Sequence, residues 1–318
     1  MFGITIKQLP NTKNSILQKI TLVAIKEKDI SLYIKREDLI HPTISGNKYR
    51  KLKYNILEAQ SQEKKTLVTF GGAFSNHIAA VALLGKKEGL KTIGIIRGDE
   101  LGNDLNKTLL SNPTLKYAHD CGMQFKFLSR SEYRDKNSKF FITNLKKEFG
   151  DFYLIPEGGT NNLAVKGCEE ILSSETAQFD YICISVGTGG TISGIINSAE
   201  AHQKTIGFSA LKGDFLTDEI KKWTCENSNW ELNTDFHFGG YAKTTNELIE
   251  FINNFKKETK IQLDPVYTGK MVFGVVDLIN KNYFAEGSRI LLVHTGGIQG
   301  IEGLNTLLKR KNKILISK

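Results

Sequence analysis

The sequence predicts an α/β protein with two parallel-sheet regions. Short apolar runs alternate with stretches of helical periodicity along the chain, which is the pattern of βα units around a parallel sheet. The runs fall into two series, and a glycine-rich turn near residue 160 lies between them. The length of 318 residues suits one large or two medium domains, and no internal repeat is clear enough to divide the chain further.

A hairpin and a helix are expected before the first series. Residues 20–26 and 30–36 flank a polar turn and predict an antiparallel pair of strands. Apolar side chains at helical spacing, with basic residues around the other sides, predict a helix that begins near Gly46 or Asn47. Lys48 then lies in the first turn of this helix.

The remaining strands form the two series. The first series comprises residues 66–72, 92–98, 125–128 and 152–159, and the second comprises residues 181–190, 205–211 and 289–297. Helical stretches separate the runs within each series. Because the chain contains no Pro-rich or Ser-rich linker and no low-complexity segment, the boundary between the two regions rests on the glycine turn alone.

The charge of the chain favours small anionic ligands over nucleic acid. The formal net charge is +9, but the 43 basic residues are dispersed among 34 acidic ones. The sequence has no arginine-rich arm and no aromatic-basic repeat, so no nucleic-acid partner is expected. A basic surface of this kind attracts anions in general.

The cysteines and the amino terminus indicate an intracellular protein. The four cysteines show neither metal-ligand spacing nor a CxxC pair, so we expect reduced thiols and no metal site. The first ten residues lack the apolar core of a signal peptide, and no apolar run reaches membrane-spanning length. The sequence therefore predicts a soluble cytoplasmic protein that does not interact with membranes.

Lys48 is the first candidate for chemistry. A cation in the first turn of a helix lies against the positive end of the helix dipole, which favours the neutral amine. A neutral lysine amine is a nucleophile and can form a Schiff base. The alternative interpretation is a solvated lysine in a lysine-rich segment, and the stretch alone favours that alternative.

Two glycine-rich turns follow predicted strands and precede helices. In GGAFSNH, residues 71–77, Ser, Asn and His side chains follow the turn at the carboxyl end of a strand, where ligands bind in parallel sheets. In SVGTGGTISG, residues 185–194, three glycines and two threonines precede a helix and can cradle a phosphate. The second turn matches neither a nucleotide P-loop nor the GxGxxG dinucleotide motif, so a single phosphate fits it better.

Two further turns complete the set. DPVYTGK, residues 264–270, places Tyr267 and Thr268 at a helix start, and HTGGIQG, residues 294–300, places Thr295 at a strand end. Each turn alone has a purely structural alternative. Four such turns and a lysine at a helix start are harder to explain by structure alone, and no Ser-His-Asp, HExxH or paired-carboxylate motif competes with them.

The order and spacing of SGNKYRKL, GGAFSNH, VGTGGT, DPVYTGK and HTGG resemble those of the fold-type II pyridoxal-phosphate enzymes. Within that fold type the chain is most similar to the 1-aminocyclopropane-1-carboxylate deaminase and D-cysteine desulfhydrase family, over nearly its whole length. The resemblance implies two three-layer α/β/α domains with the active site in the cleft between them. Residues 1–50 and 161–318 would form the large domain, residues 51–160 a small inserted domain, and two chains a homodimer.

The resemblance also assigns roles to residues of this chain. It implies that Lys48 forms a Schiff base with the cofactor and that Asn76 binds its phenolic oxygen. Ser75 then binds the substrate carboxylate or handles a proton, and a threonine meets the pyridine nitrogen. The residues implied to hold the phosphate are Gly187, Thr188, Gly189, Gly190 and Thr191, those implied to flank the substrate are Tyr241 and Tyr267, and those that could meet the pyridine nitrogen are Thr268 and Thr295.

The choice of reaction depends mainly on Thr268. The cyclopropane deaminases carry an acidic residue after the matching tyrosine, and the desulfhydrases carry threonine. A neutral hydroxyl does not keep a pyridine nitrogen protonated as a carboxylate does, which favours β-elimination over ring opening. D-cysteine, converted to pyruvate, ammonia and sulfide, is therefore the first expectation.

Two alternatives stay open at the level of the sequence. One is a 1-aminocyclopropane-1-carboxylate deaminase, which releases 2-oxobutanoate and ammonia, and the other is a cofactor-binding protein without significant turnover. Phe74 departs from the pattern of the best-known members, which have glutamine before the Ser-Asn pair. An apolar ring at this position is expected to change the shape of the pocket.

Overall fold

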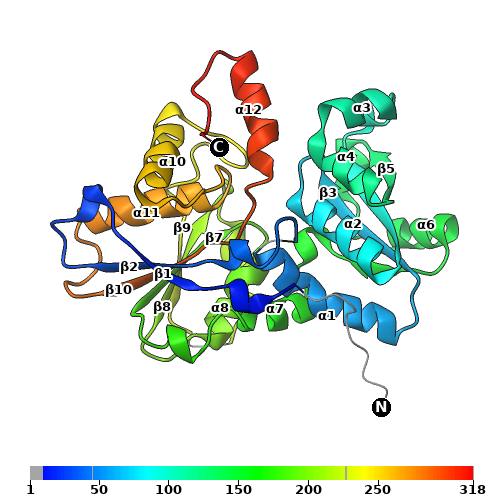
Figure 1. Ribbon diagram of the computed structural model, residues 1–318. Helices are drawn as coiled ribbons and strands as arrows, with labels where there is room; N and C mark the ends of the chain where they lie inside the picture. Colours follow the sequence, from blue (N-terminus) through cyan, green and yellow to red (C-terminus); the bar gives the residue numbers. More distant parts are fainter. Residues whose placement is uncertain (1–9, 45, 226–227, 318) are drawn as a thin grey trace.

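A computed structural model describes residues 10–44, 46–225 and 228–317. The chain forms two sheets that lie side by side and are joined by helices (Figure 1). The amino-terminal stretch considered for a signal peptide falls largely on residues 1–9, and the motif SGNKYRKL begins at Ser45, so both lie partly outside the described residues.

The larger sheet has six strands in the order β1-β2-β10-β7-β8-β9. Strand β1 pairs with β2 in antiparallel orientation, and the other neighbours are parallel. Neighbouring side chains of β7 point to opposite faces, since Cys183 and Ile184 belong to different apolar clusters. The strands are β1 (Leu17–Ile20), β2 (Ser31–Lys35), β7 (Tyr181–Val186), β8 (Lys204–Ser209), β9 (Trp230–Asn233) and β10 (Arg289–Val293).

Helices cover both faces of this sheet. One apolar cluster joins the sheet to α7 (Asn162–Glu169), α8 (Gly190–Ser198) and α9 (Phe215–Lys221). The cluster on the other face includes side chains of α10 (Asn246–Thr259), α11 (Thr268–Asn280) and α12 (Gly300–Arg310). The larger sheet is therefore the middle of three layers.

The smaller sheet has four parallel strands in the order β5-β4-β3-β6. They are β3 (Thr66–Gly72), β4 (Lys91–Arg97), β5 (Gln124–Leu128) and β6 (Tyr153–Ile155). One face packs on α1 (Asn47–Ser61), α2 (Asn76–Glu88) and α4 (Pro113–Asp120), and the other on α5 (Arg130–Arg134) and α6 (Lys139–Phe149). The short helix α3 (Leu105–Ser111) precedes and contacts α4.

The predicted hairpin is correct in its pairing and wrong in the position of its first strand. That strand is Leu17–Ile20, and residues expected to continue it form the 3₁₀ turn Val23–Ile25. Leu22 is 4% exposed and Val23 68%, while Ile25 is again buried. The buried residues Leu22 and Ile25 are three positions apart, which is the period of a 3₁₀ turn. In a strand with one buried face, every second residue would be buried.

The other predicted strands are confirmed: β3 has the predicted bounds, and β4 and β5 each begin one residue before the predicted start. The runs predicted at 181–190 and 289–297 continue into the glycine turns after β7 and β10, and the run predicted at 205–211 extends two residues past β8. Strand β6 ends before Pro156, which begins a 3₁₀ turn. Strand β9 was not predicted from the sequence. The predicted start of the Lys48 helix is confirmed, because α1 begins at Asn47.

The two sheets correspond to the two series of strands. All strands of the smaller sheet lie between Thr66 and Ile155, and those of the larger sheet lie on both sides of that segment. The exact bounds, residues 1–50 with 161–318 and residues 51–160, stay a prediction. In the part of the chain that the structure describes, no helix has the length and apolarity needed to cross a membrane.

Candidate active site

A cavity of about 350 Å³ lies where the carboxyl ends of the two sheets meet. It is lined by segments that follow β3, β7 and β10 and by the start of α1. Gly190 and Thr268 do not belong to its lining. The predicted site residues that line it are Lys48, Ser75, Asn76, Gly187, Thr188, Gly189, Thr191, Tyr241, Tyr267 and Thr295.

Lys48 enters the cavity because α1 begins beside the turn after β10. Gly46 precedes the helix with φ +58°, and a Cβ atom on it would lie 2.0 Å from the Thr295 carbonyl oxygen, so only glycine fits there. The Lys48 Nζ donates to Asn47 Oδ1 at 3.2 Å. Burial lowers the pKa of Lys48 to about 8, which makes a substantial neutral fraction available as a nucleophile near neutral pH.

The glycine turn between β7 and α8 forms an anion cradle. Gly189, with φ +83°, is the N-cap of α8, so the free amides of the first helical turn border the cavity. Asn47 Nδ2 donates to Thr191 Oγ1 at 2.9 Å, and this bond ties the cradle to the start of α1. The arrangement fits a phosphate group.

Lys51 is a site residue that the sequence analysis missed. It is 2% exposed, and its Nζ donates to Thr160 Oγ1 at 2.8 Å and to Thr188 Oγ1 at 3.3 Å. Burial, and secondarily the neighbouring Lys48, lower its pKa to about 7. Its spacing of three residues from Lys48 was the available signal, since such residues share one helix face.

Two buried polar atoms, in residues that line the cavity, have no partner among the described residues. They are Asn76 Oδ1 and His77 Nδ1, both from the start of α2. Buried polar atoms of folded proteins are normally hydrogen-bonded, so unpaired atoms in residues that line a cavity indicate a partner that comes into place there during binding or catalysis. Together with the Lys48 amine and the anion cradle, they fit pyridoxal phosphate and an amino acid bound beside it.

Tyr241 and Tyr267 form an aromatic wall of the cavity. Their ring centroids are 6.2 Å apart and the rings are tilted by 63°. Desolvation of the hydroxyl raises the pKa of both phenols, and that of Tyr267 rises well above its ordinary value, so both stay protonated donors. Tyr241 as a whole is still 46% exposed. Asp264 Oδ1 accepts from the amides of Val266 and Tyr267 and fixes the turn that carries Tyr267.

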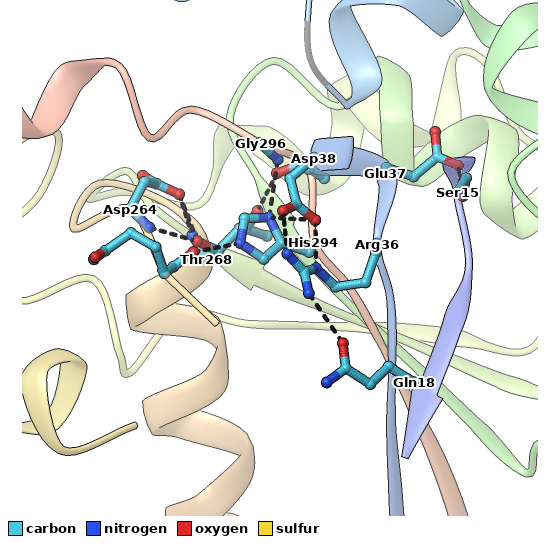
Figure 2. A network of polar contacts seen from close by, with 12 residues as sticks. Ser15, Gln18, Arg36, Glu37, Asp38, Asp264, Thr268, His294 and Gly296 are labelled. Atoms are coloured by element: carbon cyan, nitrogen blue, oxygen red, sulfur yellow. Dashed lines mark hydrogen bonds and ion pairs between the residues drawn. The ribbon is translucent and has the colours of Figure 1, made fainter. Parts of the chain in front are cut away.

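The hydroxyl of Thr268 is hydrogen-bonded to Asp264. It donates to Asp264 Oδ2 at 2.6 Å and accepts from the Asp264 amide at 3.0 Å, and the side chain is completely buried (Figure 2). Thr295 lines the cavity instead, with its hydroxyl 3.4 Å from Ser185 Oγ. Of the two threonines considered for the pyridine nitrogen, Thr295 is the one that a ligand can reach.

His294 fixes the turn that carries Thr295. Its Nδ1 accepts from the Gly296 amide at 3.1 Å, and its Nε2 therefore carries the proton that it donates to the Gln262 carbonyl at 2.7 Å. The same Nδ1 lies 3.7 Å from Asp38 Oδ1 (Figure 2). The residue acts behind the cavity and does not line it.

The structure changes the interpretation of Phe74 and adds charged residues to the lining. Phe74 does not line the cavity; its ring lies against Gly303 of α12, where a Cβ atom would meet two ring carbons at 3.3 Å. Arg97, the last residue of β4, and Glu157, which follows β6, do line the cavity. Their positions at the carboxyl ends of strands were the available signal.

The sequence matches a family over most of its length. Residues 15–296 match the family described as "Pyridoxal-phosphate dependent enzyme". A putative 1-aminocyclopropane-1-carboxylate deaminase of Pyrococcus horikoshii is 32% identical over 86% of this chain and 87% of its own length. A bifunctional D-cysteine desulfhydrase/1-aminocyclopropane-1-carboxylate deaminase of Arabidopsis thaliana is 33% identical over 85% of this chain and 73% of its own.

Solved structures show the same architecture. The crystal structure of an ACC deaminase homologue superposes with a TM-score of 0.77 at 30% identity and covers 93% of each chain. A threonine deaminase isoform of Solanum lycopersicum superposes with a TM-score of 0.62 at 16% identity over 91% of this chain and 83% of its own, which is a likeness of fold alone. These matches and the two sheets confirm the predicted fold-type II architecture.

Proposed function

Because the chain belongs to the pyridoxal-phosphate-dependent enzymes, in the family of 1-aminocyclopropane-1-carboxylate deaminases and D-cysteine desulfhydrases, we propose that it catalyses β-elimination from a small amino acid. The first candidate substrate is D-cysteine, which with water gives pyruvate, ammonia and hydrogen sulfide. The cofactor of the family is pyridoxal phosphate, and when bound it supplies the electron sink for the α-carbon.

The observation that carries the choice of reaction is the chemistry around Thr295. The cavity lining at the ends of β7 and β10 offers the hydroxyls of Ser185 and Thr295 and no carboxylate. Of the described lining residues, only Glu157 is acidic, and it follows β6 of the other sheet. A neutral hydroxyl does not hold a pyridine nitrogen protonated, and this supports elimination over ring opening.

The other steps of the reaction are assigned to side chains and helix amides that line the cavity. We assign to Lys48 the removal of the α-proton, since its buried amine is neutral in part near neutral pH. Ser75 and the first amides of α2 are assigned to the substrate carboxylate, because a helix start attracts anions. The phenols of Tyr241 and Tyr267 are assigned as donors to the leaving sulfur, since both line the cavity and their raised pKa values keep them protonated.

A substrate panel tests this function. D-cysteine, L-cysteine, D-serine, β-chloro-D-alanine and 1-aminocyclopropane-1-carboxylate are assayed for pyruvate and 2-oxobutanoate. We expect pyruvate from D-cysteine and β-chloro-D-alanine and little 2-oxobutanoate, because ring opening has to break a carbon–carbon bond and finds no α-hydrogen. Strong turnover of the cyclopropane substrate alone would make the deaminase the correct assignment, and no turnover of any compound would favour a binding protein.

The site of cofactor attachment is tested separately. Lys48 and Lys51 both carry buried amines with lowered pKa values, so they are the two rivals for the covalent link. We propose Lys48, because Lys51 is held by Thr160 and Thr188 at the cradle. Borohydride reduction followed by peptide mapping should place the cofactor on Lys48, and a label on Lys51 would contradict the proposal.

A further inference from the structure

His77 is a buried residue of the cavity for which the proposed mechanism has no use. It is the second residue of α2, is 1% exposed and lines the cavity. Its Nε2 lies 2.7 Å from the Thr69 Oγ1 of β3. A histidine in this position has either a structural role through Thr69 or a chemical role through its other nitrogen.

The hydrogen bonds around Thr69 fix the tautomer of His77. A threonine hydroxyl has one proton, and Thr69 donates it to the Ile155 carbonyl at 2.9 Å. Thr69 Oγ1 therefore accepts from His77, and Nε2 is the nitrogen that carries the proton. In a neutral imidazole the other nitrogen is then an acceptor, so Nδ1 presents a lone pair.

The charge state of His77 is fixed as well. Burial, and secondarily the nearby charges of Lys48 and Lys51, lower the pKa of His77 well below its ordinary value. The ring therefore stays neutral in the range where the enzyme is expected to work. Its Nδ1 is buried without a partner among the described residues, which leaves an unpaired acceptor in a residue that lines the cavity.

The Lys48 amine has few hydrogen-bond acceptors among the described residues. When its amine takes the α-proton it becomes an ammonium with three donors in a buried site. Among the described residues, the acceptor that its Nζ bonds is Asn47 Oδ1, at 3.2 Å. A buried ammonium with too few acceptors is costly, so a second acceptor on the cavity wall would favour proton transfer to Lys48.

We propose that His77 is a positioning residue for the proton carrier: Thr69 holds it in one tautomer so that Nδ1 accepts a hydrogen bond from the Lys48 ammonium. This role rests on the proposed function, since it assumes that Lys48 carries a proton during the reaction. It requires only residues of this chain and no further ligand.

Two variants separate this role from a structural one. His77→Gln offers Thr69 an amide donor in place of Nε2–H but removes the Nδ1 acceptor. Thr69→Val keeps the imidazole but removes the partner that fixes its tautomer. His202→Gln is the matched control, because His202 is exposed and bonds only the Ala177 carbonyl among the described residues.

The first measurement uses the nitrogen resonances of His77 in the holoenzyme. We expect a protonated Nε2 and an unprotonated Nδ1 from pH 6 to 9 in the wild type, and a mixture of tautomers in Thr69→Val. Protonated Nδ1 in the wild type would overturn the proposal. This result does not depend on which substrate is turned over, so it remains decisive if the proposed function fails.

The second measurement concerns Lys48 itself. The rate at which the cofactor-free chain forms its covalent link with pyridoxal phosphate is followed against pH. Loss of an acceptor for the ammonium lowers the pKa of the amine, so His77→Gln should reach half-maximal rate at lower pH, by about half a unit or more. With the best substrate of the panel, we expect kcat of His77→Gln to be at least tenfold lower than that of the wild type. KM should change by less than threefold in either direction. An unshifted midpoint, or wild-type kcat, would overturn the proposal, and His202→Gln should change neither.

Discussion

Lys48 and Lys51 lie one helical turn apart and both line the cavity. Burial there disfavours the charged form of both amines. Burial lowers the pKa of Lys48 to about 8 and that of Lys51 to about 7. Lys51 lies at the anion cradle, where a bound phosphate would restore its charge. Burial therefore has a different consequence for each lysine. It makes the Lys48 amine reactive, and it leaves Lys51 with a charge that a bound phosphate would stabilise.

Lys51→Met tests the cost of this buried charge. The amine of Lys51 releases its proton in the folded state at a pH where the unfolded chain still binds it, so its contribution to the free energy of unfolding rises as the pH increases through about 7 toward 10. The variant should remove this part of the pH dependence. We expect the melting temperature of the cofactor-free wild type to gain relative to Lys51→Met between pH 7 and 9. A constant difference over this range would contradict the lowered pKa.

Two threonines test which hydroxyl serves the ligand. Thr268→Val removes a buried bond to the Asp264 carboxylate and should cost about 2 kcal/mol of unfolding free energy while the cofactor spectrum stays unchanged. Thr295→Val should have the opposite profile, with a changed absorption spectrum of the bound cofactor and little loss of stability. Denaturant unfolding and absorption spectroscopy measure the two effects, and a changed spectrum in Thr268→Val alone would reverse the assignment.

At the scale of elements, the loop that carries Tyr241 depends on α11. Four of its residues, Phe238, Gly239, Gly240 and Ala242, have positive φ angles, and for the two that are not glycine this conformation is strained. Lys270 of α11 is 1% exposed and donates to the carbonyls of His237 and Gly240, both at 2.8 Å. These two bonds hold the loop against the helix that also follows Tyr267.

Lys270→Met tests whether these bonds position Tyr241. We expect KM for the best substrate to rise about tenfold, since two hydrogen bonds of ordinary strength, each worth about 1 kcal/mol, hold the loop. Attachment of the cofactor should stay intact because Lys270 does not line the cavity. Lys243→Met is the control, as Lys243 is an exposed lysine close to the same loop. Equal KM values in both variants would show that the loop holds its position without Lys270.

At the scale of the whole molecule, Phe74 links the two sheets. The ring belongs to the loop between β3 and α2 and packs on Gly303 of α12, which covers the larger sheet. Helix α12 also contacts α4 above the smaller sheet. Because Phe74 directly precedes Ser75, this contact connects the relative position of the two sheets to the position of a substrate residue.

Phe74→Ala should therefore loosen the cleft without changing its lining. We expect a higher KM for the amino acid, an unchanged spectrum of the bound cofactor and a larger radius of gyration in solution scattering. Phe140→Ala, at a ring that is 78% exposed on α6, is the control. If Phe74→Ala instead alters only the ranking of substrates, the ring acts on the pocket as the sequence analysis expected. The homodimer and the cytoplasmic location stay predictions, and light scattering measures the first.

The sequence by itself determined the elements and the motifs that border the site. The start of α1, strand β3 and the glycine turn before α8 were all predicted, because helical period, apolar runs and glycine turns are signals of neighbouring residues. The first strand was misplaced where an apolar run was buried with the spacing of a turn. The pattern of neighbouring residues thus decides where helices and strands begin, unless contacts with residues distant in the sequence favour another conformation.

Only the tertiary structure decided which side chains the cavity uses. Lys51 became a cradle residue through Thr160 and Thr188, which are 109 and 137 positions away in the chain. The hydroxyl of Thr268 is hydrogen-bonded to Asp264 and does not line the cavity. The tautomer of His77 is fixed because Thr69 donates to the carbonyl of Ile155, which is 86 positions away from Thr69 in the chain. Burial, pKa and hydrogen-bond roles depend on partners that only folding brings together, and the local sequence carries no record of them.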